Sequence, residues 1–238
     1  MESNITENLY TGSSIAKSGF KAEDIFINDK SLRKKLETYF NKYIFKIDKV
    51  HGKKYDVIIT FTDNTKFKIQ IKKIENLKGR GDSFDRCNIK NTFDNHFIRK
   101  YLVYLSLFRP SPRKTNMDSE TKKDFIKLCN KNIDDIKNFV KKTLIGPEND
   151  GNDYLCIMHT NKTFDNIKLY CIDSHKLLEY IYKSLKIDIS LKDNGTCLHL
   201  SHNLYLQRKG GGKKDKSPND IQSKIKIDNK ILSICDKL

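Results

Sequence analysis

Lys-Tyr-Asp-Val-Ile-Ile-Thr-Phe (residues 54–61) and Lys-Phe-Lys-Ile-Gln-Ile-Lys-Lys-Ile (residues 66–74) are the two stretches that decide the fold. Both are rich in β-branched and aromatic residues, and apolar side chains alternate with polar ones, which is typical of half-buried β-strands. The residues between them, Thr-Asp-Asn-Thr, are turn formers. The sequence therefore predicts a β-hairpin over residues 54–74.

The length of the hairpin loop decides which side chains meet across the two strands. Apolar residues share one face of the first strand (positions 55, 57, 59 and 61) and one face of the second (positions 67, 69 and 71). A two-residue loop pairs Asp56 with Ile71, whereas a three-residue loop or a bulge pairs Asp56 with Gln70 or Lys72. Because the two apolar faces have to be buried together, we predict the odd-length connection, which places Asp56 beside Gln70 and Lys72.

An aspartate, a second oxygen ligand and a lysine on neighbouring strands suit metal-dependent cleavage of phosphodiesters. Mg²⁺ prefers hard oxygen ligands, here the Asp56 carboxylate, the Gln70 amide oxygen and the Ile71 carbonyl. Lys72 can orient or deprotonate a metal-bound water, or stabilise the transition state. The alternative is an edge strand that carries lysines only to discourage pairing with other chains.

The charge of the chain points in the same direction. It has 238 residues, with 46 Lys and Arg against 30 Asp and Glu, and a formal net charge of +16. This excess favours a polyanionic partner such as nucleic acid, although only seven of the basic residues are arginine. No apolar stretch is long enough for a membrane span, the first residues lack the pattern of a secretion signal, and the cysteines form no close pair typical of a zinc site. We therefore expect a cytoplasmic protein that does not enter the membrane.

The rest of the chain predicts an α/β protein. We expect one domain over residues 1–238, with a central mixed β-sheet flanked by helices and a helical insertion at 88–145. The helical patterns lie at 14–46, 88–108, 119–144 and 174–185, and the first of them has a break at 28–31 with Ser31 as a candidate N-cap. Loops are predicted at 75–87 and 145–152. Further strands are predicted at 154–159, 167–172, near 188–191, 196–200 and 203–207, and in the alternating run 221–227.

Four segments together resemble a known family. They are Gly12 to Ile25, Asp56 with Gln70-Ile71-Lys72, Gln207-Arg208-Lys209-Gly210-Gly211, and Ser217 to Ile225. In this order and spacing they resemble type II restriction endonucleases of the PD-(D/E)xK superfamily, and among these the HinP type, which cuts GCGC. The resemblance implies the PD-(D/E)xK nuclease core and cleavage of double-stranded DNA at a short specific site. It also implies Mg²⁺ as the cofactor, with Mn²⁺ as a substitute, and 5′-phosphate ends.

The resemblance also implies roles for single residues. Asp56 matches the metal-binding aspartate, Gln70 the second ligand in place of the commoner acid, and Lys72 the catalytic lysine. Glu23 matches a glutamate that many of these nucleases place beside the metal, and the alternative for it is an ordinary acid of the first helical turn.

Two regions are candidates for DNA recognition. Residues 79–86 fall where HinP-type enzymes carry a stretch that meets bases, but the sequence differs there, so the resemblance leaves the target site open. Arginines can reach guanine or phosphate, and aspartates can accept from cytosine. The predicted DNA-binding residues are Arg80, Asp82, Ser83, Asp85 and Arg86 in this loop, and Gln207, Arg208, Lys209, Asn219, Gln222 and Lys224 in the C-terminal segments.

Two other functions remain open. One is a basic nucleic-acid-binding protein that does not cleave, and the other is a structure-specific DNA repair nuclease of the same superfamily. For a restriction enzyme we expect double-stranded DNA as the partner, the bacterial cytoplasm as the location, and a cognate DNA methyltransferase as a functional partner. The choice between monomer and homodimer is left open.

Overall fold

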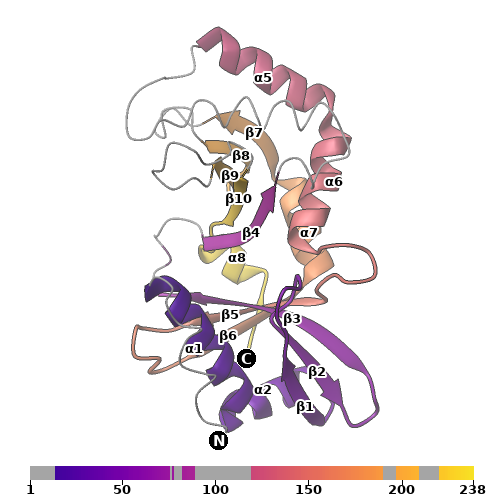
Figure 1. The fold of residues 1–238 in the computed structure, drawn as a ribbon, viewed down its shortest axis with the longest axis vertical. Coiled ribbons are helices and arrows are strands. Elements are labelled where there is room, and N and C mark those ends of the chain that lie inside the picture. Colours follow the sequence, from indigo (N-terminus) through magenta and orange to yellow (C-terminus); the bar gives the residue numbers. More distant parts are fainter. Residues whose placement is uncertain (1–13, 76, 78–81, 89–118, 190–196, 209–219) are drawn as a thin grey trace, which may run out of the picture. The chain divides into compact units, whose positions relative to one another are not determined.

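The computed structural model describes residues 14–75, 77, 82–88, 119–189, 197–208 and 220–238. They belong to two compact units (Figure 1). Unit 1 comprises Met1–Leu77, Pro147–Ser174 and Leu232–Leu238, and unit 2 comprises Lys78–Gly146 and His175–Ile231. The expectation of a single domain stays a prediction. No helix in the described part of the chain is long and apolar enough to cross a membrane.

Unit 1 is built on a six-stranded mixed sheet, which confirms the predicted α/β class. The strand order is β1-β2-β3-β5-β6-β11, and β3 and β5 run parallel while the other neighbours are antiparallel. The strands are β1 (Ile44–Lys49), β2 (Val57–Phe61), β3 (Lys66–Ile74), β5 (Tyr154–His159), β6 (Lys168–Asp173) and β11 (Asp236–Lys237).

The β2–β3 hairpin has the odd-length loop that the sequence predicts. Phe61 is the last paired residue of β2, since its amide donates to the carbonyl of Thr65 at 2.9 Å. Three residues therefore form the loop, and the third of them, Asn64, has a left-handed φ of 64°, which asparagine tolerates. The odd-numbered side chains of both strands enter the core as expected, namely Val57, Ile59, Phe61, Ile69 and Ile71, with Phe67 packed against them.

Two helices cover this core. They are α1 (Ser14–Asn28) and α2 (Lys30–Phe40), which bury Ala22, Phe26, Leu32 and Leu36 among the strand residues. The predicted break is confirmed, but the N-cap of α2 is Asp29 and not Ser31. The Asp29 carboxylate accepts hydrogen bonds from the amides of Ser31 (2.8 Å) and Leu32 (3.0 Å), which satisfies amides that have no partner within the helix.

The predicted helix over 14–46 extends too far. Asn41 adopts a left-handed conformation (φ 51°) and ends α2, and β1 begins at Ile44. Tyr43, which lies within the predicted helix, is 77% exposed. Ile44 and Ile47 are spaced as in a helix, so this short strand could not be recognised from periodicity.

Unit 2 contains a five-stranded antiparallel sheet in the order β4-β10-β9-β8-β7. Its strands are β4 (Asp82–Asn88), β10 (Asp220–Ile225), β9 (Leu204–Arg208), β8 (Cys197–Ser201) and β7 (Leu185–Ile189). Its helices are α5 (Ser119–Lys131), α6 (Ile133–Leu144), α7 (Ser174–Lys183) and the first part of α8 (Asn229–Ser233), whose last residues belong to unit 1. The helical pattern at 119–144 is confirmed, while the one at 88–108 lies outside the described residues. The predicted loop 75–87 is wrong in part, because residues 82–88 pair with β10 as a strand.

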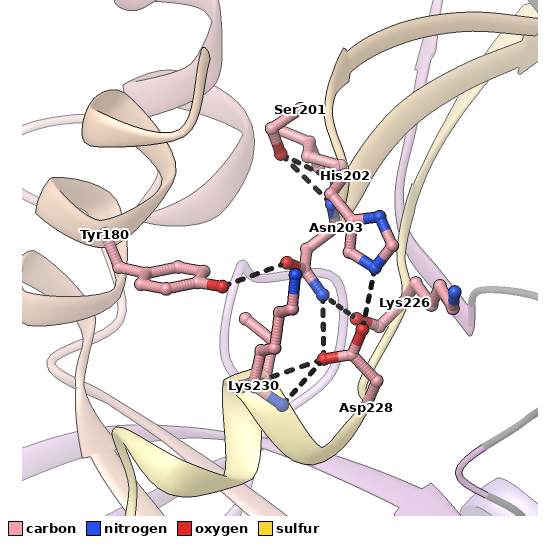
Figure 2. A network of polar contacts seen from close by, with 9 residues as sticks. Tyr180, Ser201, His202, Asn203, Lys226, Asp228 and Lys230 are labelled. Carbon is pink, nitrogen blue, oxygen red and sulfur yellow. Dashed lines mark hydrogen bonds and ion pairs between the residues drawn. The ribbon is translucent and has the colours of Figure 1, made fainter. Parts of the chain in front are cut away.

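A buried polar network joins several elements of unit 2 (Figure 2). Asn203, in the turn between β8 and β9, is 0% exposed. Its amide accepts from the Tyr180 hydroxyl (3.2 Å) and donates to the Lys226 carbonyl (2.8 Å) and to Asp228 (3.1 Å). The Asp228 carboxylate also accepts from the backbone amides of Lys230 and Ile231 at the start of α8, and it contacts His202 Nε2 at 3.0 Å.

The hydrogen bonds of this network decide the charge state of Asp228. Burial by itself raises the pKa of this carboxyl group, but the hydrogen bonds from Ile231, Asn203 and His202 outweigh burial and lower the pKa below its ordinary value. The carboxylate is thus kept ionised where α8 begins.

Candidate functional site

Asp56 lies at the point where the first three strands of unit 1 meet. Its carbonyl accepts from the Val50 amide, and its own amide donates to the Ile69 carbonyl, both at 2.9 Å. The regular register pairs Ile69 with Val57, so the hydrogen bond from the Asp56 amide to Ile69 is shifted by one residue. The backbone is therefore irregular at Asp56, as in a β-bulge, and such an irregularity changes the direction of a side chain. The Asp56 carboxylate accepts a hydrogen bond from the Ile71 amide at 2.7 Å. The structure therefore brings Asp56 against the middle of the Gln70-Ile71-Lys72 triplet.

Gln70 and Lys72 lie on β3 beside buried apolar residues of the neighbouring strand. Their partners in the parallel register are Leu155 and Ile157 of β5, both fully buried. Gln70 is itself 5% exposed and Lys72 is half-buried. Charges interact more strongly in such apolar surroundings than in water. A charged ligand bound here would therefore interact strongly with the charged side chains beside it.

Glu23 reaches the same region from α1. Its carboxylate lies 3.2 Å from the ammonium group of Lys49, the last residue of β1. Burial raises the pKa of Glu23, the hydrogen bond from Lys49 opposes this, and the negative charge of Asp56 raises the pKa further. Because the charge of Asp56 acts on Glu23, the two carboxylates belong to one electrostatic environment.

The oxygen donors at this place fit a hard divalent cation. Glu23 and Asp56 supply carboxylates, while the Gln70 amide and the Ile71 carbonyl supply neutral oxygens of the kind that Mg²⁺ accepts. The raised pKa of Glu23 means that negative charge is unfavourable there, and a cation relieves this cost. Within the described ranges, no group of three or more His, Cys, Asp or Glu side chains is arranged to hold a metal ion, so a site here depends on the neutral oxygens as well.

The candidate DNA-binding segments come together in the sheet of unit 2. Gln222, on β10 between β4 and β9, is in register with Arg86 of β4 on one side and with Gln207 of β9 on the other. Three segments that are far apart in the sequence therefore form one row across three strands. The other predicted DNA-binding residues have different positions. Three of them lie outside the described residues, namely Arg80, Lys209 and Asn219. Arg208 is in register with Ile221, and β4 carries Asp82, Ser83 and Asp85 opposite Ile225, Lys224 and Ser223 of β10.

A second row runs beside the first. Lys224 is in register with Ser83 of β4 and with Tyr205 of β9. Tyr205 is in turn paired with His199 of β8, and the rings of Tyr205 and His199 stack. Lys224 is half-buried, whereas Gln222 is only 7% exposed. Lys224 is therefore better placed to reach a phosphate directly. The positions between these rows, such as Ser223, Leu206 and Leu198, are buried.

One residue of the candidate metal site was not found from the sequence. Lys49 binds Glu23 and also Asp24, whose carboxylate lies 2.8 Å from the Lys49 ammonium group. The predicted helix over 14–46 covers only the first residues of β1, and the sequence predicted no element at 47–49. Nothing in the sequence distinguishes this lysine from the many others.

Comparison with known proteins gives a similarity among solved structures. No protein-family model matches the chain, and no curated protein matches it. Among solved structures, the chain is similar to the restriction endonuclease MspI in complex with its cognate DNA, with 12% sequence identity and a TM-score of 0.49, over 85% of this chain and 81% of that one.

Proposed function

We propose that this protein is a Mg²⁺-dependent endonuclease that cleaves double-stranded DNA at a short specific site, in the manner of type II restriction enzymes. One observation carries the proposal. The carboxylate of Asp56 is bound to the backbone of the Gln70-Ile71-Lys72 triplet on the neighbouring strand, and its charge acts on Glu23 of α1. Oxygen ligands and a lysine are thus held together by the sheet itself.

The chemistry follows from the residue types. Asp56, Gln70, the Ile71 carbonyl and Glu23 would hold the metal, whose chemistry would be to lower the pKa of a water molecule and to offset charge on the phosphate. Lys72 orients the attacking water and stabilises the negative charge of the transition state through its ammonium group. The Ile71 amide keeps the Asp56 carboxylate in one orientation, which limits the reorganisation needed during the reaction.

The rows of unit 2 give the proposed DNA contacts. By residue type, Arg86 and Gln207, which flank Gln222 on the neighbouring strands, are suited to contact base edges, and Lys224 is suited to contact phosphate. By the HinP-type resemblance, GCGC is the first target to test, and Mn²⁺ is expected to replace Mg²⁺.

Cleavage of plasmid DNA tests the function. The wild type is expected to cut with Mg²⁺ into fragments with 5′-phosphate ends and to leave the plasmid intact with EDTA. Lys72→Ala and Asp56→Asn are expected to cut at least about a hundredfold more slowly, because each removes a group that acts on the reacting phosphate or its metal. Lys66→Ala, an exposed lysine of the same strand, is the control and is expected to cut like the wild type.

The alternatives give different results in the same experiment. If the wild type binds the plasmid but leaves it intact with both Mg²⁺ and Mn²⁺, the protein is a binding protein without nuclease activity. If only branched DNA is cut, it is a structure-specific repair nuclease. Discrete bands from linear genomic DNA support restriction, and sequencing of the fragment ends then gives the target site. A methyltransferase gene beside the gene of this protein would add independent support.

A further inference from the structure

Lys49 occupies a central place among the carboxylates of the candidate metal site. Its ammonium nitrogen lies 3.2 Å from Glu23 Oε2 and 2.8 Å from Asp24 Oδ1, and it also lies over the Phe20 ring at 5.5 Å from the centroid. All three contacts come from α1. The lysine therefore ties the helix that carries Glu23 to the end of β1.

The same strand end is tied to Asp56. Lys49 is in register with Val57, the residue after Asp56, and the amide of the following residue, Val50, donates to the Asp56 carbonyl at 2.9 Å. The side chain of Lys49 thus binds the Glu23 carboxylate, while the residue that follows Lys49 is bonded to the main chain of Asp56.

This ion pair is shielded from solvent. The side chains of Lys49 and Glu23 are 22% and 17% exposed, whereas Lys46 and Asp48 of the same strand form a pair that is 53% and 46% exposed. A shielded pair is screened less by solvent and salt, and removal of one partner leaves the other charge without compensation.

We infer that Lys49 is a positioning residue that acts as the built-in counter-cation of Glu23, holding this carboxylate toward Asp56 and competing with a divalent cation for it. The inference rests on the proposed metal-dependent function. A single ammonium group compensates the carboxylates when no metal is bound, and a divalent ion that takes Glu23 has to displace it. Lys49 therefore stabilises the metal-free protein and weakens metal binding.

Mn²⁺ alone, without DNA, is the probe that tests this role. Lys49→Met is expected to lower the melting temperature of the metal-free protein and to bind Mn²⁺ on the order of tenfold more tightly than the wild type, because a positive charge close to the ion has been removed. Binding is measured by calorimetry and by the rise in melting temperature with Mn²⁺ concentration. A purely structural lysine would lower stability without improving Mn²⁺ binding.

Three further variants make the test specific. Lys49→Arg keeps the charge and is expected to bind Mn²⁺ like the wild type. Lys46→Met removes an exposed lysine of the same strand and is expected to change neither quantity. The double variant Glu23→Gln with Lys49→Met is expected to regain metal-free stability and to lose the improved Mn²⁺ binding. If Lys49→Met alone does not fold, folding of the double variant supports the pairing of Lys49 with Glu23, and failure of both overturns it.

Plasmid cleavage by the same proteins separates this inference from the proposed function. If the wild type cuts DNA but Lys49→Met binds Mn²⁺ no more tightly, the role of Lys49 is overturned and the function stands. If Lys49→Met gains affinity while no protein cuts DNA, the role of Lys49 stands and the function falls. If Mn²⁺ binds to none of them and no DNA is cut, both are overturned.

Discussion

Asn203 shows how much a single polar side chain can hold together within unit 2. Its amide group bonds to a tyrosine hydroxyl of α7, a backbone carbonyl that follows β10, and the carboxylate that caps α8. A buried polar group is stable only when its hydrogen bonds are satisfied. An apolar residue at this position would remove three hydrogen bonds at once, although Asp228 would keep its other partners.

Asn203→Ala is therefore expected to destabilise the protein by about 2 kcal/mol or more, because buried polar groups lose their partners. Tyr180→Phe removes only one bond of the same network and is expected to cost about 1 kcal/mol. Urea denaturation of both variants measures the free energy of unfolding. A loss below about 0.5 kcal/mol for Asn203→Ala, the level of an ordinary surface substitution, would show that the network does not contribute to stability.

At the same scale, the candidate metal site was only partly predictable. Alternation placed Asp56, Gln70 and Lys72 near one another, because side-chain direction in a strand follows from sequence position. The hydrogen bond from the Ile71 amide to Asp56 was not predictable, since it depends on an irregularity of the backbone at Asp56. The pairing of Lys49 with Glu23 depends on how a helix packs on a strand, which no local pattern encodes.

At the scale of elements, several strands were predicted well and capped helix ends were not. The alternating strand at 66–74 and the continuous apolar strand at 154–159 have the predicted bounds, because a short β-type pattern preceded by turn residues marks each of them. The end of α2 depends on the left-handed conformation of Asn41, and its start on which of two neighbouring polar residues turns back to the helix. In both cases neighbouring residues are of types that suit a helix cap, and only the backbone geometry selects which of them forms it.

The N-cap of α2 can be tested directly. Asp29→Ala is expected to cost about 1 kcal/mol of stability, because the amides of Ser31 and Leu32 lose their acceptor. Ser31→Ala is the matched comparison and is expected to cost clearly less, since Ser31 lies inside the helix. Urea denaturation distinguishes them, and a larger loss for Ser31→Ala would restore Ser31 as the cap.

At the scale of the whole molecule, the division into two units could not be predicted. Each unit is assembled from segments that are separated in the sequence. Two of the points where the chain passes from one unit to the other lie in the predicted loops 75–87 and 145–152, but the other two lie within α7 and α8, where no loop pattern marks them. The sheet of unit 2 was equally hidden, because β4 becomes a strand only through its pairing with β10, more than a hundred residues later.

The roles proposed for the two units can be separated by experiment. Lys224→Ala, in unit 2, is expected to weaken DNA binding at all sequences and to reduce the slope of log K against log salt by about 0.9, as for the loss of one phosphate contact. Its Mn²⁺ binding is expected to stay unchanged. Lys127→Ala, an exposed lysine of α5, removes the same charge and serves as the control. A salt slope equal to that of the wild type would remove Lys224 from the DNA interface.

The order in which the strands of unit 1 pair has a consequence for how the chain folds. After β3 is made, its parallel partner β5 follows only at residue 154, and β6 gains its second neighbour, β11, only at residue 236. Such distant pairings make folding slow, because a long loop must close before each contact is formed. Until β11 arrives, the outer edge of β6 is open to any extended chain nearby. A ribosome that stalls before residue 236 would thus release a chain prone to aggregation.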